Sequence, residues 1–290
     1  MLIAYLQLAG AMILAGSTVA AAKPVVAVVP VYVFGLLRFA IAAAILVPMA
    51  WRGGLGAASR RDLGAAVLLA FFGAFLFTVL ILEGVARTSA LDAALITSTI
   101  PAATLLLSAL LLGERLTLRR GAAVLLATAG IAVIALPDAA GGAVRSLLGN
   151  LLVVAAVFSE AMFTVLAKRL GAALSPVPLA AVTAVSATTM FLPFAAVQVG
   201  TAGWPAIDGA TWGLILFYST AGSVLAFLLW FQGLRRVDAG VAGAFTVLLP
   251  VSGAGLAVLA LGERPTVGHA AALILALAAI ALATGRSRGS

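Results

Sequence analysis

The sequence of 290 residues has no cysteine, one histidine and few charged residues. Without cysteine, the chain has neither disulfides nor thiolate metal sites. A single histidine with no neighbouring cluster of carboxylates also argues against a metal centre, and we expect no cofactor. Charged residues make up 9% of the chain, against about 25% in an average soluble domain, so water is not its main solvent.

Hydrophobic residues make up 64% of the chain, and its mean hydropathy is +1.24. A chain in lipid must pair every backbone N–H and C=O group internally, which only helices and closed barrels achieve. The strands of a membrane barrel alternate polar and apolar residues, and the apolar runs of this chain do not. The composition therefore predicts an all-α polytopic membrane protein.

Ten apolar runs, separated by charges or by clusters of glycine and proline, predict ten transmembrane helices. Most are close to the length of about 20 residues that crosses a hydrocarbon core. They are expected near residues 3–22, 30–50, 63–83, 91–112, 119–136, 147–167, 176–197, 210–231, 240–261 and 267–284. The first run ends in Ala20-Ala21-Ala22-Lys23, which resembles a signal-peptide cleavage site. No basic residue precedes that run, so we expect a retained helix.

The basic residues indicate how the chain is oriented. The net charge is +8 and the pI is 11.3, but these residues lie singly or in pairs at the ends of apolar runs, so we expect no nucleic-acid partner. With ten spans, twelve of the 17 lysines and arginines fall in connections on one side and four on the other. The positive-inside rule then places both termini in the cytoplasm, with the protein in the cytoplasmic (inner) membrane.

An internal repeat divides the chain into two halves. Residues 73–117 and 222–266 share one pattern at a constant offset of 149 residues, without a gap. We expect a first repeat of five helices over residues 1–137 and a second over 147–285, together forming a single transmembrane domain. Because five is an odd number, the second repeat enters the membrane with inverted topology.

The repeated motifs resemble a known family. Pro101 is followed by Gly113-Glu114-Arg115-Leu116-Thr117, and Pro250 by Gly262-Glu263-Arg264-Pro265-Thr266. This doubled pattern is similar to EamA-type members of the drug/metabolite transporter superfamily, over essentially the whole chain. The resemblance implies a basket of ten helices around a central cavity and a secondary carrier, often an exporter of amino acids and small metabolites. Glu160 departs from the family pattern, in which an aromatic residue often takes that place.

Two proline residues predict kinks in equivalent spans. Pro101 and Pro250 are expected near the centres of the fourth and ninth helices, where each frees the carbonyl four residues earlier. Those carbonyls belong to Thr97 and Thr246, so each repeat offers an acceptor beside a hydroxyl at similar depth. The functional interpretation is a substrate-binding or gating element between the repeats. The alternative is a structural kink in which the threonine caps its own helix.

Two charges fall inside predicted spans. Glu160 lies eight residues before Lys168, deep in the sixth helix, where a carboxylate costs at least about 2.5 kcal/mol on insertion scales. It is interpreted as a proton-coupling group, as an anchor for a substrate amine, or as a structural partner of Arg38. Arg38 in the second helix is a further candidate, with snorkelling to the membrane surface as its alternative.

Four further residues complete the candidate substrate site. Phe75 and Trp230 belong to aromatic groups in the third and eighth helices, which form either an apolar pocket or lipid-facing bulk. Ser17 and Phe163 lie in the first and sixth helices, which are equivalent in the two repeats. Glu114 and Glu263 fall at opposite faces of the membrane, so we expect them to cap or pair at helix ends rather than to act together.

These features favour a secondary active transporter that exports amino acids or similar small amphipathic metabolites. It would work by alternating access between the repeats, with proton coupling left open. The alternatives are a lipid scramblase or flippase, a passive channel and a membrane-embedded enzyme. An enzyme needs a convergent set of acids, bases or metal ligands, so we assign no catalytic residue. The expected partners are an amino-acid-like metabolite and the lipid bilayer, with the protein acting as a monomer or a homodimer.

Overall fold

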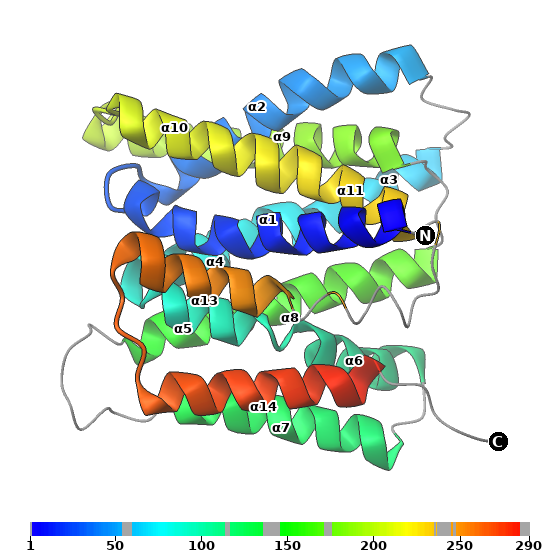
Figure 1. Ribbon diagram of the computed structural model, residues 1–290. Helices are drawn as coiled ribbons and strands as arrows, with labels where there is room; N and C mark the ends of the chain where they lie inside the picture. The colour runs from blue at the N-terminus through cyan, green and yellow to red at the C-terminus, as the bar shows by residue number, and fades with distance from the viewer. Residues whose placement is uncertain are drawn as a thin grey trace.

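The computed structural model describes residues 2–53, 60–113, 117–135, 146–170, 176–234, 236, 245 and 248–284, and in these ranges it contains helices and no strand. Figure 1 shows them as a stack of nearly parallel rods. In chain order they are α1 (Leu2–Val26), α2 (Val31–Gly53), α3 (Arg60–Ala70), η1 (Phe71–Leu76), α4 (Phe77–Arg87), α5 (Ala90–Thr97), α6 (Ile100–Leu112), α7 (Leu118–Ala135), α8 (Leu147–Leu170), α9 (Pro176–Ala202), α10 (Gly209–Phe217), η2 (Tyr218–Leu225), α11 (Ala226–Leu234), α13 (Leu248–Leu261) and α14 (Val267–Thr284).

Most of these helices are long and apolar enough to cross a bilayer. Six uninterrupted stretches meet that requirement, and the bent pair α5–α6 makes a seventh if it counts as one span. The described part of the chain also contains three shorter apolar helices: Gly121–Val133, Leu248–Leu261 and Val267–Leu282. The all-helical architecture with several membrane spans is confirmed, and the number of ten spans stays a prediction.

Helix packing repeats itself in the two halves of the chain. α1 packs on α11 and α13, while α8 packs on α4 and α6, which are the counterparts of α11 and α13 at the offset of 149 residues. Equivalent helices also pair directly, α2 with α9 and α7 with α14, as the lower pair in Figure 1 shows clearly. The first helix of each half therefore lies among the later helices of the other half, and the two halves share one interior.

Glycines of the repeated motif end equivalent helices. Gly113 follows α6 with φ of 69°, and Gly262 follows α13 with φ of 67°. A left-handed residue at this position ends a helix, and glycine adopts it without steric cost. The glycine of each Gly-Glu-Arg sequence is thus a helix stop.

Two π-helical segments interrupt equivalent spans. η1 (Phe71–Leu76) and η2 (Tyr218–Leu225) coincide at the repeat offset, since residues 71–76 correspond to 220–225. A π-helical turn takes in an extra residue and is often found at functional sites. Each half therefore departs from regular α-helical geometry at the same depth in its third span.

The span that contains Pro101 is broken rather than kinked at its centre. α5 ends at Thr97 and α6 begins at Ile100, so Pro101 occupies the first turn of a new helix, where its missing N–H is not needed. The two helices meet at 40°. The last carbonyls of α5 accept hydrogen bonds from three consecutive hydroxyls: Thr97 donates to Ala94 O, Ser98 to Leu95 O and Thr99 to Ile96 O.

The mid-helix position expected for Pro101 is therefore wrong, whereas that of Pro250 stays a prediction because residues 246 and 247 lie outside the described residues. Because Pro101 can begin a helix as readily as it can bend one, the sequence alone did not separate the two cases. Pro250 is the third residue of α13 and is buried. Thr246 lies outside the described residues.

Glycine allows α1 to approach α13 closely. Gly16 of α1 faces Gly253 of α13, and a methyl group added at Gly16 would overlap Leu249 O and Ser252 Oγ. The added methyl group would also lie 3.1 Å from Gly253 N; Leu249 O and Gly253 N are backbone atoms, which cannot move aside as a flexible side chain does. We predict that Gly16→Ala lowers the midpoint of thermal unfolding by roughly 5 °C, since overpacking typically costs about 1–3 kcal/mol.

A matched substitution controls for the helix propensity of alanine. Gly213 in α10 has no atom within 4 Å of an added methyl group, so Gly213→Ala should leave the midpoint unchanged or raise it slightly. Both variants are compared by thermal unfolding in one detergent. Equal midpoints for the two would show that α1 and α13 are not packed at Gly16.

Candidate functional site

Arg38 lies near the middle of α2 and points into the interior rather than toward the membrane surface. Its Nε donates to Ser223 Oγ at 2.7 Å, and Nη1 donates to Thr78 Oγ1 at 2.9 Å. The guanidinium carbon also lies 4.5 Å from the centroid of the Tyr218 ring, within range of a cation–π contact. Snorkelling is therefore not how this charge is accommodated.

Both halves of the chain hold the Arg38 guanidinium. Thr78 belongs to the first turn after η1, whereas Ser223 and Tyr218 belong to η2. The sequence analysis did not assign these three residues to the site. The available signal was physical: an arginine in lipid needs acceptors, and hydroxyls near the repeated Gly73 and Gly222 are placed to supply them.

Glu160 of α8 supplies the opposite charge. It lies close enough to Arg38 for the two charges to attract, but they form no ion pair within 4.0 Å in the described part of the chain. Its neighbours Ser159 and Ala161 are buried, whereas Glu160 itself keeps partial exposure. A cation and an anion therefore share the interior without direct contact.

Ser159 fixes α8 against the first π-helical segment. Its hydroxyl donates to Phe72 O of η1 at 2.8 Å. Glu160 is the next residue along α8, and Phe163 follows one turn later. The Phe163 ring packs over Gly73, where its nearest atom would lie 2.5 Å from a Cβ added to the glycine. In the other half Thr18 of α1 fills the space above Gly222 in the same way. The approach of α8 and of α1 to the π-helical segments thus depends on the two repeated glycines.

The remaining candidate residues have individual surroundings. Phe75 packs in an aromatic group with Phe191 at 4.8 Å and Phe194 at 5.6 Å, between ring centroids. Ser17 donates its hydroxyl to Ile13 O in its own helix at 2.7 Å. Trp230 lies half-buried in α11, and Thr97 is buried at the end of α5. Arg38 and Glu160 attract each other, and among the described residues no hydrogen bond or ring contact joins Phe75, Ser17, Trp230 or Thr97 to either of them.

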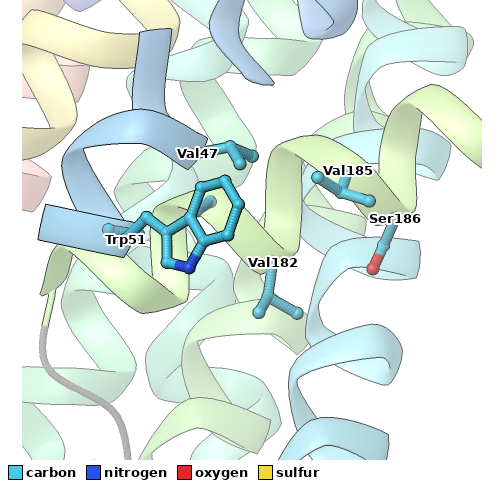
Figure 2. Close-up of a pocket in the computed structure, with 7 residues that line it drawn as sticks. Val47, Trp51, Val182, Val185 and Ser186 are labelled. Atoms are coloured by element: carbon cyan, nitrogen blue, oxygen red, sulfur yellow. The ribbon is translucent and has the colours of Figure 1, made fainter. Parts of the chain in front are cut away.

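A groove on the outside of the helix stack contains none of these residues. It lies between α2 and α9, and Figure 2 shows the indole of Trp51 beside Val47 with Val182 and Val185 opposite. Its volume is about 350 Å³, and Ser186 is the one hydroxyl among its lining residues. Trp51 is 80% exposed, as expected for an aromatic residue at the membrane interface. The apolar lining fits lipid rather than a charged solute.

Comparisons with known proteins find one matching family and several related proteins. The model of the EamA-like transporter family matches residues 2–136 and again residues 147–285. Among curated proteins, "Uncharacterized transporter YetK" of Bacillus subtilis is 35% identical over 86% of this chain and 77% of its own length. A "Probable terminal-alkyne amino-acid exporter" of Streptantibioticus cattleyicolor is 27% identical over 79% of this chain and 76% of its own. One crystal structure superposes with a TM-score of 0.66 at 22% identity, over 97% of this chain and 95% of the other, which shows a shared fold.

The hydroxyl of Thr78 is predicted to stabilise the fold through Arg38. In Thr78→Val, Arg38 Nη1 loses its acceptor, and loss of a hydrogen bond to a charged group typically costs about 1.5–3 kcal/mol. We expect a lower midpoint of thermal unfolding. Thr104→Val is the control, because the Thr104 hydroxyl bonds only Ile100 O of its own helix at 2.9 Å. Identical midpoints in the two variants would contradict the role of Thr78.

Proposed function

This chain belongs to the EamA-like transporter family, and on that premise we propose that it is a secondary carrier for small amphipathic metabolites of amino-acid type. The observation that carries the proposal is the pair of opposite charges in the membrane interior, Arg38 and Glu160, held apart on elements of both halves. Charged groups in a membrane protein interior are costly and mark substrate or ion pathways.

We propose that the site binds a zwitterion between these two charges. The Arg38 guanidinium, already oriented by Thr78 and Ser223, presents further N–H groups to a substrate carboxylate. Glu160 is the counter-charge for a substrate ammonium group. Phe75, Phe163, Ser17, Thr97 and Trp230 stay proposed contributors from the surrounding helices, with Pro101 and Pro250 at the flexible points of their spans.

The proposed topology is ten spans in two inverted repeats, residues 1–137 and 147–285. Two contacts support it. Glu263, just after the end of α13, caps the start of α5, so the fourth and ninth spans run in opposite directions. Thr88 bonds Asn150 near the start of α8 and lies beside Lys23 near the end of α1, so the first and sixth spans also oppose each other.

Alternating access follows from this arrangement. If the halves rock against each other, Arg38 and Glu160 are exposed to one side of the membrane and then to the other. We propose export from the cytoplasm through the cytoplasmic membrane, with both termini cytoplasmic and the protein working as a monomer or a homodimer. Glu160 serves either as an amine anchor in a uniporter or as the proton-binding group of an antiporter.

Scrambling of lipid is the second candidate function, and the surface does not favour it. A scramblase needs a polar groove open to lipid along which a headgroup can move. The groove between α2 and α9 is open to lipid but lined by apolar side chains apart from Ser186. Its apolar lining suits contact with the acyl chains of lipids and offers no polar path for a headgroup.

Transport by proteoliposomes tests the zwitterion site. The chain is reconstituted and counterflow is measured for a labelled amino acid, its carboxyl amide and its deaminated analogue, at two pH values. We predict that the wild type prefers the amino acid over both analogues. Glu160→Gln should reduce the discrimination against the deaminated analogue by about tenfold or more, the usual effect of removing a buried charge partner.

A carboxylate that is paired within its own helix provides the control. Glu83 pairs with Arg87 one turn away in α4, so Glu83→Gln should transport as the wild type does. If Glu160→Gln leaves the rate, the substrate preference and the pH dependence unchanged, both the anchoring and the coupling role of Glu160 are wrong.

A further inference from the structure

A buried polar cluster lies at the end of the molecule where α1 ends and α5, α8 and α14 begin. Thr88 and Asp92 are completely buried, and Asn150 and His269 are 4% and 6% exposed. Two further charges, Lys23 and Glu263, adjoin them. We call this set the Asp92 cluster, and its members are Lys23, Thr88, Asp92, Asn150, Glu263 and His269.

Asp92 and His269 form the centre of the cluster. His269 Nε2 lies 2.9 Å from Asp92 Oδ1, and the backbone N–H of Thr266 donates to His269 Nδ1 at 2.8 Å. Because Nδ1 accepts a hydrogen bond, the imidazole proton is on Nε2 and is donated to the carboxylate. The lone histidine of the sequence thus has a partner 177 residues away.

Glu263 joins the same two elements by a second route. Its carboxylate accepts from the N–H groups of Ala90 and Leu91 at 2.9 and 2.8 Å, at the N-terminus of α5. A carboxylate at this position is favoured by the unpaired N–H groups and by the helix dipole. The capping role expected for Glu263 is confirmed, and the helix that it caps belongs to the other half.

Lys23 and Thr88 extend the cluster to α1 and α8. Lys23 Nζ donates to Val85 O at 2.7 Å and to Thr88 O, which caps the end of α4, and the charge of Lys23 attracts that of Glu263. The Thr88 hydroxyl donates to Asn150 Oδ1 at 2.6 Å. Three connections therefore cross between the halves: Asp92 to His269, the start of α5 to Glu263, and Thr88 to Asn150.

At the equivalent positions of the other half, the sequence keeps the glutamate, with Glu114 in place of Glu263, but four other members of the cluster are replaced. At the repeat offset of 149 residues, Lys23 corresponds to Ala172, Thr88 to Val237, Asp92 to Val241 and His269 to Arg120. Three of the four positions are apolar. A symmetric pair of halves is thus joined at one end by buried charged hydrogen bonds, and the sequence does not repeat this arrangement at the other end.

We propose that the Asp92 cluster is the gate that closes the transport pathway at the end opposite the termini. This inference rests on the proposed function, because a gate requires a carrier that opens. During opening, His269 leaves Asp92 and Glu263 leaves the start of α5, so that the two halves separate there. These residues position the halves and do not touch the substrate.

The absence of cysteine allows a direct measurement of the gate. Ala86 at the end of α4 and Val267 at the start of α14 are exposed and belong to different halves. Cysteines introduced at these two positions, Ala86→Cys and Val267→Cys, are the only thiols of the chain. Spin labels attached to them report the distance between the halves by pulsed electron resonance in lipid nanodiscs, without any substrate.

In this doubly labelled background we expect His269→Ala to shift the halves apart. The variant leaves the Asp92 carboxylate buried without its imidazole donor. The population at longer distance should rise about tenfold or more relative to the closed population, the change expected for loss of a hydrogen bond to a charge. His269→Gln, whose amide N–H can reach Asp92, should restore most of the closed population.

Arg87→Ala is the matched control, because it removes a charge pair at the same end but within a single helix. It should leave the distances unchanged. If His269→Ala also leaves the distances between the labels unchanged in folded protein, the Asp92 cluster is not a gate. Should that variant fail to fold, Glu263→Gln, which keeps one acceptor oxygen but removes the charge, must increase the longer population, and its failure overturns the proposal.

The outcome for the gate is separate from the outcome for transport. Distances that respond to His269→Ala in a chain that carries no amino acid would leave the gate correct and the substrate wrong. Unchanged distances in a chain that does carry amino acids would leave the proposed function correct and the gate wrong.

Discussion

The interior of this protein depends on how Arg38 is hydrogen-bonded in a medium without water. A guanidinium in lipid must find its acceptors within the protein, and here they come from Thr78 in one half and Ser223 in the other. Any motion of one half against the other must therefore keep these bonds or replace them. A substrate carboxylate is a suitable replacement because it accepts from the same N–H groups. Binding and relative motion of the halves are thus linked through one side chain.

The two halves share helix stops and π-helical segments, but their sequences differ at the polar positions of the Asp92 cluster. The helix stops at Gly113 and Gly262 and the π-helical segments η1 and η2 are conserved in position between the halves. The polar residues are not: Asp92 corresponds to Val241 and Thr88 to Val237. An inverted repeat with identical ends would have no preferred side. In the proposed carrier, substitutions at a few such positions would set the relative stability of the two closed ends.

The sequence predicted the helices well and their partners poorly, for different physical reasons. Lipid excludes unpaired backbone, so long apolar runs map onto helices directly, and the doubled motif identified the family. The break before Pro101 was missed because proline fits both the first turn and a kink. The π-helical segments follow no local pattern of hydropathy. Contacts such as Asp92 with His269 join positions 177 residues apart, and only the packing of both halves brings them together.

The short helix α5 carries Asp92 and packs on α8, the helix that carries Glu160. All eight of its residues are buried, Asp92 stands in its first turn, and its last residue, Thr97, adjoins the 40° break before α6. At that break, three hydroxyls donate to the last carbonyls of α5, and the backbone N–H of Thr99 also donates to Ile96 O. A side-chain hydroxyl can follow a carbonyl as the angle between two helices changes, whereas a backbone N–H is fixed in its own helix. In the proposed gate, the hydroxyls of Thr97 and Ser98 keep the carbonyls of Ala94 and Leu95 paired as α5 turns, which a moving element in a membrane requires.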